Sequence, residues 1–367
     1  MATQKLSDRR ESFFYRCPSV AVLLVSILLV PLLSLVRAQE QSLVSGRSCA
    51  TMDVLEQQLA QYPERGKRLD ALDEFTVSYL AQREAARSLG FTLEAETVRI
   101  IPVYVHVLYQ TAGQNIAAEQ VESQITVLNQ DYRRMLSTPG YGNGADTYIQ
   151  FELAAVPAES TSGGTVDAYG INRKYVNKEE WGWDDDMKKS SAEGIDPVTP
   201  NTHLNIWVCN IGSGILGYAQ FPGGSSDTDG VVIGPEFFGS SDIYPDGYYG
   251  APYDKGRTTT HEVGHYLNLR HIWGDGDCSV DDFVVDTPRS DASNYGCPAG
   301  HMSCGSVDMI ENYMDYTDDT CMDSYTQGQV DRMAACLVST RASLGTDISL
   351  QGNGMKIAPI FMLLLNN

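Results

Sequence analysis

The spacing of apolar residues changes along the chain, and the change marks its organisation. Between residues 39 and about 97, apolar residues recur at helical spacing in the segments 52–62 and 71–89, and Gly90 ends that pattern. The following segment, 100–110, is β-branched and aromatic and predicts a strand. We therefore expect a separate helical unit, followed by a domain that contains a sheet.

Strands and helices then alternate before the chain becomes irregular. An amphipathic pattern over 117–136 predicts a helix. Apolar runs predict three further strands, over 148–156, 203–211 and 229–234. The later part is rich in Gly, Asp and Cys and ends in a predicted helix within 326–344. The pattern indicates an α/β fold with a loop-rich C-terminal part.

The first 38 residues have the composition of a secretory signal peptide. A basic start precedes the apolar run 20–36, and small residues follow before Gln39. The alternative is an uncleaved signal anchor, since the run is long. Ser26, Pro31 and Ser34 interrupt the run, and this favours cleavage after residue 38 and a secreted protein.

Charge narrows the possible partners. The formal net charge is −21, which argues against nucleic acid, because binding phosphates requires clustered Lys and Arg. The C-terminal segment 346–367 contains the apolar run 357–365, which is too short to span a bilayer. We expect a docked or frayed terminus there and no stable membrane insertion after signal cleavage.

Three of the six histidines lie within the segment 261–271, "HEVGHYLNLRH". On a helix, His261 and His265 lie one turn apart on one face, so both imidazoles can reach one ion. Glu262 is placed to act on a water molecule at that ion. The preceding threonines could cap the start of this helix.

His271 can join the other two histidines only if the helix stops and the chain turns back. Asn268 is suited to this turn, because Asn tolerates left-handed backbone geometry. Three neutral histidines leave a tetrahedral zinc ion one open position, as in catalytic sites. The alternative is a core helix whose histidines are satisfied by hydrogen bonds, and the third histidine disfavours it.

This segment, together with "ENYMDYTDDTCM" at 311–322, resembles the pappalysin metalloproteases, which belong to the metzincins. The resemblance covers about residues 98–340. It implies a metzincin-like zincin fold, with a twisted mixed sheet and an active-site helix. The one departure from the general signature is Asn268, where that signature has Gly.

The resemblance also implies residue roles. Glu262 would be the general base, Tyr316 would donate a hydrogen bond to the oxyanion, and Met314 would form the methionine turn beneath the metal. The segment 215–221 resembles the edge strand along which an extended substrate pairs; an ordinary strand is the alternative.

Two acidic segments suggest further sites. Asp318 and Asp319 follow the methionine turn, and we expect Asp319 to favour Arg or Lys after the scissile bond. In "CSVDDFVVDTP", the resemblance implies a calcium site at Asp282, Thr287 and the Val285 carbonyl. In both cases the alternative is a solvated acidic loop.

Seven cysteines remain once Cys17 leaves with the signal peptide, and export predicts disulfides. The resemblance implies the pairs Cys278–Cys304 and Cys297–Cys321. Cys209 and Cys336 could pair or stay as buried thiols.

Cys49, with Arg47 nearby, resembles the thiol of zymogens that occupies the open position of zinc. Residues 39–97 would then be an inhibitory pro-segment. The alternative is that Cys49 pairs with Cys209 or Cys336.

Together these features predict a secreted zinc endopeptidase that acts on proteins or peptides and is made as a zymogen. The expected parts are a signal peptide (1–38), a pro-segment (39–97), a catalytic domain (98–345) and a tail (346–367). One rival hypothesis is an enzyme that acts on non-protein amides, and the predicted edge strand argues weakly against it. The other rival hypothesis is a secreted, zinc-containing binding protein without catalytic activity. The presence of Glu262 argues against that rival, since a protein without catalysis has little need of it.

Overall fold

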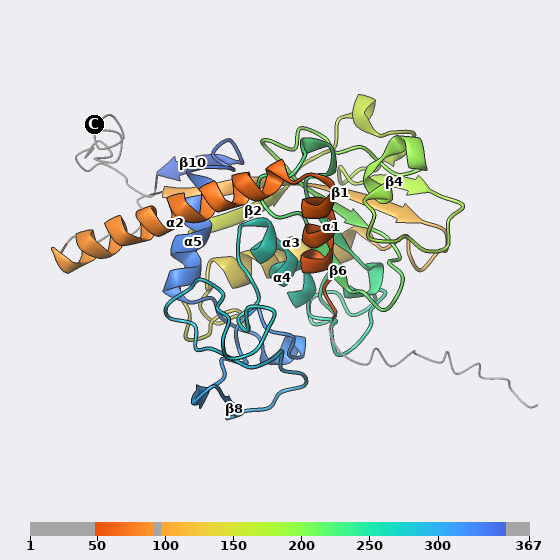
Figure 1. Cartoon of the computed structure of the whole chain (residues 1–367). Helices are drawn as coiled ribbons and strands as arrows, with labels where there is room; N and C mark the ends of the chain where they lie inside the picture. The colour runs from red at the N-terminus through yellow and green to blue at the C-terminus, as the bar shows by residue number, and fades with distance from the viewer. Residues whose placement is uncertain (1–47, 91–96, 350–367) are drawn as a thin grey trace, which may run out of the picture. The chain divides into compact units, whose positions relative to one another are not determined.

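The computed structural model describes residues 48–90 and 97–349 (Figure 1). The expected signal peptide, Arg47 and the C-terminal segment from residue 350 lie outside the described residues. Among the helices of the described ranges, none is both long and apolar enough to cross a membrane.

A mixed sheet of eight strands forms the centre of the fold. Its main path runs in the order β3-β4-β1-β5-β7-β6, and both β2 and β10 also pair with β1. The strands of this sheet are β1 (Thr97–Tyr109), β2 (Ile149–Leu153), β3 (Thr165–Val166), β4 (Asn172–Tyr175), β5 (Leu204–Val208), β6 (Gly217–Ala219), β7 (Val231–Ile233) and β10 (Thr346–Ser349).

The long strand β1 organises this sheet. It pairs in parallel with β2, β4 and β5, at different points along its length. Its residues from Val103 to Leu108 are all buried, as expected for a strand covered on both faces. Strand β10 pairs antiparallel with the start of β1, so residues 346–349, expected to begin the tail, belong to the sheet.

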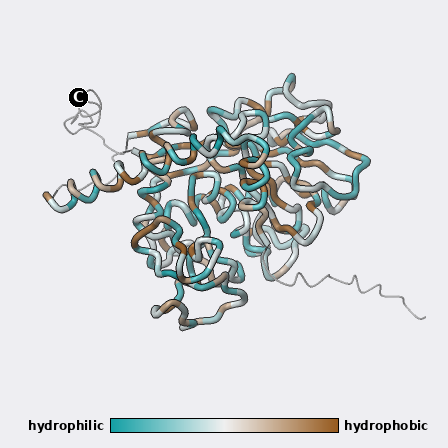
Figure 2. The backbone as a smooth tube through the Cα atoms, in the orientation of Figure 1, coloured by the Kyte–Doolittle hydropathy of each residue, from teal (hydrophilic) through white to brown (hydrophobic). Residues whose placement is uncertain are grey.

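Within the described residues, five α-helices accompany the sheet: α1 (Thr51–Gln61), α2 (Glu64–Ser88), α3 (Ala118–Tyr132), α4 (Arg257–Tyr266) and α5 (Gln327–Leu337). Helix α3 packs on β2, α4 packs on β6 and β7, and α3 and α4 contact each other. Buried apolar residues of the strands and of α3 and α4 form the core. Figure 2 shows the hydropathy of each residue along the same backbone. Helix α2 lies beside α5 (Figure 1).

The chain between α4 and α5 contains little regular structure. It holds the two-stranded sheet of β8 (Met302–Ser303) and β9 (Ser306–Val307). It also holds one of the six short 3-10 helices found in the part of the chain that the structure describes. These 3-10 helices are Ala158–Ser160, Asp186–Lys188, Ser190–Ala192, Ser226–Thr228, Pro235–Phe237 and Asp319–Cys321. This part is the expected loop-rich region, and the α/β class with its helical N-terminal segment is confirmed.

Some sequence-based boundaries were wrong. The amphipathic pattern over 117–136 extends beyond α3, which ends at Tyr132, and Arg134 has φ 45°. Strands β3 and β4 were not expected. They are short, and their residues show no clear alternation of polar and apolar side chains from which a strand could be predicted.

Candidate active site

The helix that carries the histidines, α4, begins differently from the sequence-based prediction. The N-cap is Gly256, at φ 85°, and the threonines expected to cap the helix lie inside its first turn. The cap comes from a distant loop: Asp319 Oδ2 accepts hydrogen bonds from the backbone amides of Lys255 (2.8 Å) and Arg257 (3.1 Å). A carboxylate at this position also complements the helix dipole.

The turn after α4 confirms the role expected of Asn268. Its φ is 79°, in the left-handed region, and the Leu269 amide bonds back to the Gly264 carbonyl at 2.9 Å. Arg332 Nε donates to the Asn268 carbonyl at 2.7 Å, which ties the turn to α5. The turn brings His271 back towards the helix.

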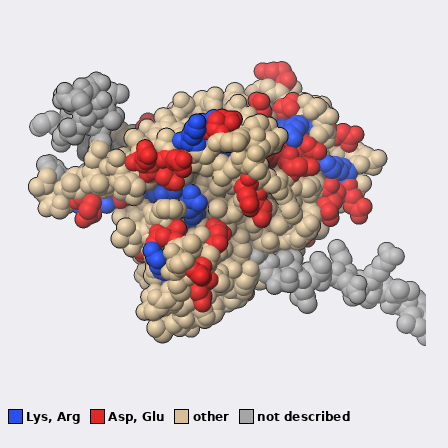
Figure 3. All heavy atoms as spheres, viewed as in Figure 1, with Lys and Arg blue, Asp and Glu red and all other residues tan. Residues whose placement is uncertain are grey.

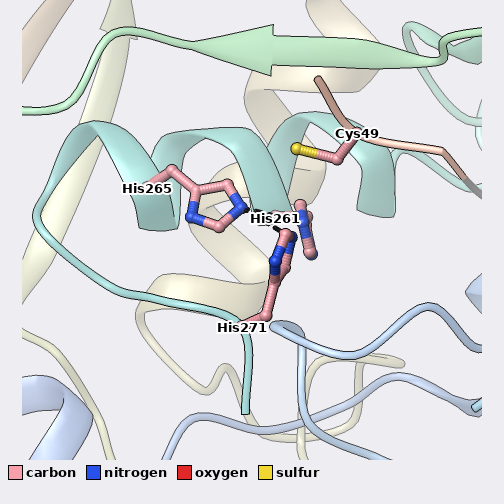
Figure 4. Close-up of side chains that lie close together, drawn as sticks. All are labelled: Cys49, His261, His265 and His271. Atoms are coloured by element: carbon pink, nitrogen blue, oxygen red, sulfur yellow. Dashed lines mark hydrogen bonds between the residues drawn. The ribbon is translucent and has the colours of Figure 1, made fainter. Parts of the chain in front are cut away.

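The three imidazoles point towards one another (Figure 4). His265 Nε2 lies 3.1 Å from Nε2 of both His261 and His271. Each Nδ1 donates to an acceptor elsewhere: His261 to the Tyr313 carbonyl (2.7 Å), His265 to the Leu269 carbonyl (2.8 Å) and His271 to the Asp275 carboxylate (2.5 Å). These bonds fix the tautomer that leaves every Nε2 with a lone pair.

This donor set fits zinc. Ligands about 2.05 Å from a tetrahedral ion are about 3.3 Å apart, close to the Nε2 separations here. Burial lowers the pKa of His265 well below its usual value, and the neighbouring His271 acts in the same direction. The imidazole therefore stays neutral, as a metal ligand must.

Cys49 supplies a fourth ligand atom. The ligand atoms of Cys49, His261, His265 and His271 all lie within 4.8 Å of one another, and all four residues are buried. Cys49 comes from a segment that runs beside β6, with its sulfur towards the imidazoles (Figure 4). This segment pairs in parallel with β6: Leu216 N donates to Ser48 O (2.9 Å), and Ala50 N to Gly217 O (3.2 Å).

The thiol and Glu262 are neighbours. Cys49 Sγ lies 3.3 Å from Glu262 Oε2. Burial, followed by the Glu262 carboxylate, raises the pKa of the Cys49 thiol well above its usual value. A thiolate at this position is therefore stable only beside a cation.

Two residues at the site were missed by the sequence analysis. Thr51 Oγ1 donates to Glu262 Oε2 at 2.8 Å and accepts from the Ala219 amide at 2.8 Å, so it links the segment of Cys49 to both the glutamate and β6. Asp275, the partner of His271, lies four residues after it in sequence. That spacing could have identified Asp275 as a partner of His271, whereas no pattern in the sequence pointed to Thr51.

Tyr316 and Met314 lie at the site from the loop after β9. The Tyr316 hydroxyl contacts the backbone of Cys49, 3.3 Å from its nitrogen and 3.4 Å from its oxygen. Burial and then Cys49 raise the pKa of the phenol, so it remains a donor. Met314 packs under α4: a Cβ at Gly264 would lie 2.5 Å from Met314 Sδ, so a larger residue there would displace the methionine side chain.

The two aspartates expected near a specificity pocket have different surroundings. Asp319 is 2% exposed and caps α4 as described above. Asp318 is half-buried, and its amide donates to the Gly296 carbonyl at 3.0 Å.

Two of the three residues expected to bind calcium come together. Asp282 Oδ1 accepts from Thr287 Oγ1 (2.8 Å) and from the Val284 amide (3.0 Å). Asp282 is 3% exposed, and burial raises the pKa of its carboxyl to about 7. Val285 is fully exposed.

The cysteines divide as the family resemblance implies. Cys278 bonds to Cys304, and Cys297 bonds to Cys321. Both bridges lie in the loop-rich region. Cys49, Cys209 and Cys336 are buried free thiols, so neither Cys209 with Cys336 nor Cys49 with either of them forms a disulfide.

Comparison with known proteins places this arrangement in a family. Residues 201–338 match the model of peptidase family M43, described as pregnancy-associated plasma protein-A. An extracellular metalloprotease of Arthroderma benhamiae is 34% identical over 249 residues, which are 66% of this chain and 79% of that protein. Extracellular metalloprotease 1 of Coccidioides posadasii is 32% identical over 271 residues, or 72% of this chain and 84% of that protein.

Solved structures agree with the sequence relatives. Mature mirolysin of Tannerella forsythia, in complex with a cleaved peptide, is 43% identical, with a TM-score of 0.58 over 64% of this chain and 90% of that chain. A promirolysin mutant from the same organism is 37% identical, with a TM-score of 0.63 over 81% of this chain and 96% of that chain. The match to the longer precursor extends over more of this chain. The chain therefore belongs to the pappalysin family of metzincins and is a zinc metalloendopeptidase.

Proposed function

We propose that this chain is the secreted, latent precursor of a peptidase that cleaves proteins at a zinc site formed by His261, His265 and His271. The convergence of their three Nε2 atoms on one buried point, with Glu262 and Cys49 beside it, carries the proposal. Residues 1–38 would be the signal peptide, 39–97 the pro-segment and 98–345 the catalytic domain, to which the pairing of β10 adds residues 346–349.

This geometry supports the following roles for the reacting groups. When bound, zinc polarises the scissile carbonyl and lowers the pKa of a water molecule. Glu262 would take a proton from that water and deliver it to the leaving amine. The Tyr316 hydroxyl, held as a donor by its raised pKa, stabilises the oxyanion. Met314 supports α4 from below and takes no part in proton transfer.

Latency would come from Cys49. Its sulfur lies where the fourth zinc ligand is needed, and its segment occupies the edge of β6 that an extended substrate would use. Thr51 and Cys49 also hold the Glu262 carboxylate, so the general base is occupied as well. Removal of the segment would free the metal, the base and the strand edge together.

The preference among substrates would come from acidic residues after the methionine turn. We expect Arg or Lys after the scissile bond, attracted by the Asp318 and Asp319 carboxylates. Asp319 would act from the floor of the pocket through its charge, since it is buried, while Asp318 lies closer to the surface. Asp319→Asn also weakens the cap of α4, so Asp318→Asn is the necessary second variant. If both variants keep the preference for Arg or Lys, this assignment is refuted.

A calcium ion would bind at Asp282 and Thr287, together with the carbonyl of Val285. A buried carboxylate whose pKa is raised to about 7 carries a free-energy cost when ionised, which a cation would offset. Added calcium should raise the Tm of the wild type at pH 8 and leave that of Asp282→Asn unchanged. An equal rise in both proteins would place the ion elsewhere.

Secretion is supported by the signal-like N-terminus and by the relatives, which are named extracellular. If the chain is expressed with its own N-terminus, the protein recovered from the medium should begin at Gln39. Retention of the full chain in the membrane fraction would favour the signal anchor instead.

The central experiment is cleavage of a peptide mixture by the processed protein, with the cut sites read by mass spectrometry. We expect cuts that a zinc chelator abolishes and that precede Arg or Lys. Glu262→Gln should reduce turnover by about a thousandfold or more while zinc content is unchanged. Glu122→Gln, on the exposed face of α3, is the matched control. Zinc-loaded protein that makes no cut would favour a binding protein over an enzyme.

A further inference from the structure

Asp73 on α2 is bound by two arginines that belong to the catalytic domain. Arg332 Nη2 lies 2.7 Å from Asp73 Oδ1, and Arg270 Nη2 lies 3.6 Å from Asp73 Oδ2. Arg332 is buried, with 2% of its side chain exposed, and Arg270 has 22% exposed. The carboxylate comes from the pro-segment, whereas both guanidinium groups stay with the enzyme.

These arginines lie next to the metal site. Arg270 directly precedes His271 in sequence, and its guanidinium carbon lies 6.0 Å from the ring centroid of Phe221 and 5.0 Å from that of Phe283. The Phe221 ring in turn lies 5.5 Å from that of His265. Phe221 continues the chain of β6, so Arg270 is beside the path of any peptide that pairs with this strand.

The pro-segment covers this region in the precursor. Leu55 and Leu69 pack on Phe221, and Arg65 donates to the Phe221 carbonyl at 2.9 Å. Figure 3 shows basic side chains among acidic patches on the face that α1 and α2 cross. When the pro-segment leaves, Arg270 and Arg332 lose the carboxylate that they share, and two neighbouring guanidinium groups favour a new anion.

We propose that Arg270, supported by Arg332, binds an acidic side chain of the substrate on the N-terminal side of the scissile bond. Asp73 occupies this subsite in the precursor. The inference rests on the proposed function, because it requires removal of the pro-segment. It adds a second determinant of specificity, opposite in charge to the expected Asp318 and Asp319 pocket.

The side of the bond follows from the positions of the two charged regions. Asp319 lies at the start of α4, and Arg270 lies beyond its end, four residues after Tyr266. Arg270 also lies 6.0 Å from the ring of Phe221, two residues past the end of β6. A peptide that pairs antiparallel with β6 places the residues before its scissile bond at that end. If the residue after the bond lies towards Asp319, the residues before the bond extend towards Arg270.

The test compares peptides that share one cleavable bond. Glu or Gln is placed in turn at the second, third and fourth residue before the bond, and kcat/KM is measured for the processed wild type. At one position Glu should be preferred about tenfold, mainly through KM, as expected for a charged hydrogen bond that is partly exposed. Salt should reduce this preference.

Arg270→Gln should bring the Glu to Gln ratio to about one. Arg270→Lys retains the charge and the stem over Phe221, and it should keep part of the preference. Arg99→Gln, which removes a positive charge beside β10, is the control and should retain the wild-type ratio. Arg332 is not replaced, because it also holds the Asn268 turn.

Two results would overturn the inference: a wild type that cuts the Glu and Gln peptides equally at every position, or a preference that persists in Arg270→Gln. Either result leaves the proposed function intact, since peptides are still cut. A processed protein that cuts no peptide at all contradicts the proposed function itself.

Discussion

The helical segment α1–α2 and the sheet domain that it contacts are held together in different ways. The domain has a large apolar core, to which β1, β5, β7 and the helices α3 and α4 contribute. The helical segment contributes a small apolar cluster, in which Leu55 and Leu69 pack on Phe221. Ala50 and Val54 join a second apolar cluster with Trp181 and Tyr218 of the domain. The segment also makes several directed polar contacts.

These polar contacts are spaced along the whole segment. Thr51 bonds to Glu262, Arg65 bonds to the Phe221 carbonyl, and Asp73 bonds to Arg332. Arg83 and Arg87 both pair with Asp331 on α5, at 3.0 and 2.7 Å. A segment that must leave benefits from such contacts, because polar groups that its release exposes can bond to water instead.

The largest expected effect comes from removing the thiol. Cys49→Ala should convert the unprocessed precursor from nearly inactive to active, because the fourth zinc position is no longer filled. Activity of the intact precursor on a peptide substrate is the measurement. Cys336→Ala, which removes another buried free thiol, should stay latent. A latent Cys49→Ala precursor would mean that the polar contacts alone block the cleft.

The disulfides of the loop-rich region are expected to contribute to the stability of the domain. Replacing Cys297 and Cys321 by Ala opens a bridge between residues 24 apart, which should cost about 3 kcal/mol in the free energy of unfolding. Denaturant unfolding of the processed enzyme measures this loss. Opening the Cys278–Cys304 bridge, of similar span, should cost about the same. Unchanged stability in both variants would show that the loops keep their structure without the disulfide bridges.

The sheet should also respond to acid. Burial lowers the pKa of His106 on β1 to about 4. The hydrogen bond with Asn205 raises this pKa, but by less than burial lowers it. The unfolded state therefore binds more protons than the folded state between about pH 6.5 and 4. Stability from this group is present above pH 6.5 and falls by about 2 kcal/mol on going to pH 5. His106→Gln should flatten this slope, and an equally steep slope in that variant would assign it to other groups.

The smallest effect should come from the outer end of α2. Replacing both Arg83 and Arg87 by Gln removes the pairs with Asp331, which are worth about 1 kcal/mol because the arginines are partly exposed. Activation of the precursor by added protease should then be about fivefold faster. Lys67→Gln, at an exposed position on the same helix, should not change the rate. An unchanged activation rate in the double variant would show that the pro-segment is anchored only by residues nearer the metal site.

The sequence predicted the parts of this account that depend on local spacing. The histidine pattern, the left-handed turn at Asn268 and the helical segments each lie within a short stretch of chain, where periodicity and backbone preference decide the outcome. The disulfide pairs and the thiol switch came from family resemblance, and spacing alone left several pairings open.

The features that were missed join distant residues. Asp319 caps α4 from about sixty residues away, and the threonines expected to cap that helix are displaced into it. The contact of Asp73 with Arg332 spans 259 residues. No local pattern specifies such pairs, because they depend on how the sheet and loops bring surfaces together.

The most direct test of the central claim is the X-ray absorption spectrum of zinc in the intact precursor and in the processed enzyme. The account predicts one sulfur ligand at about 2.3 Å, beside nitrogen ligands at about 2.0 Å, in the precursor. This sulfur should be absent from the processed enzyme and from the Cys49→Ala precursor. A precursor whose zinc has no sulfur ligand would contradict the assignment of Cys49 as the switch.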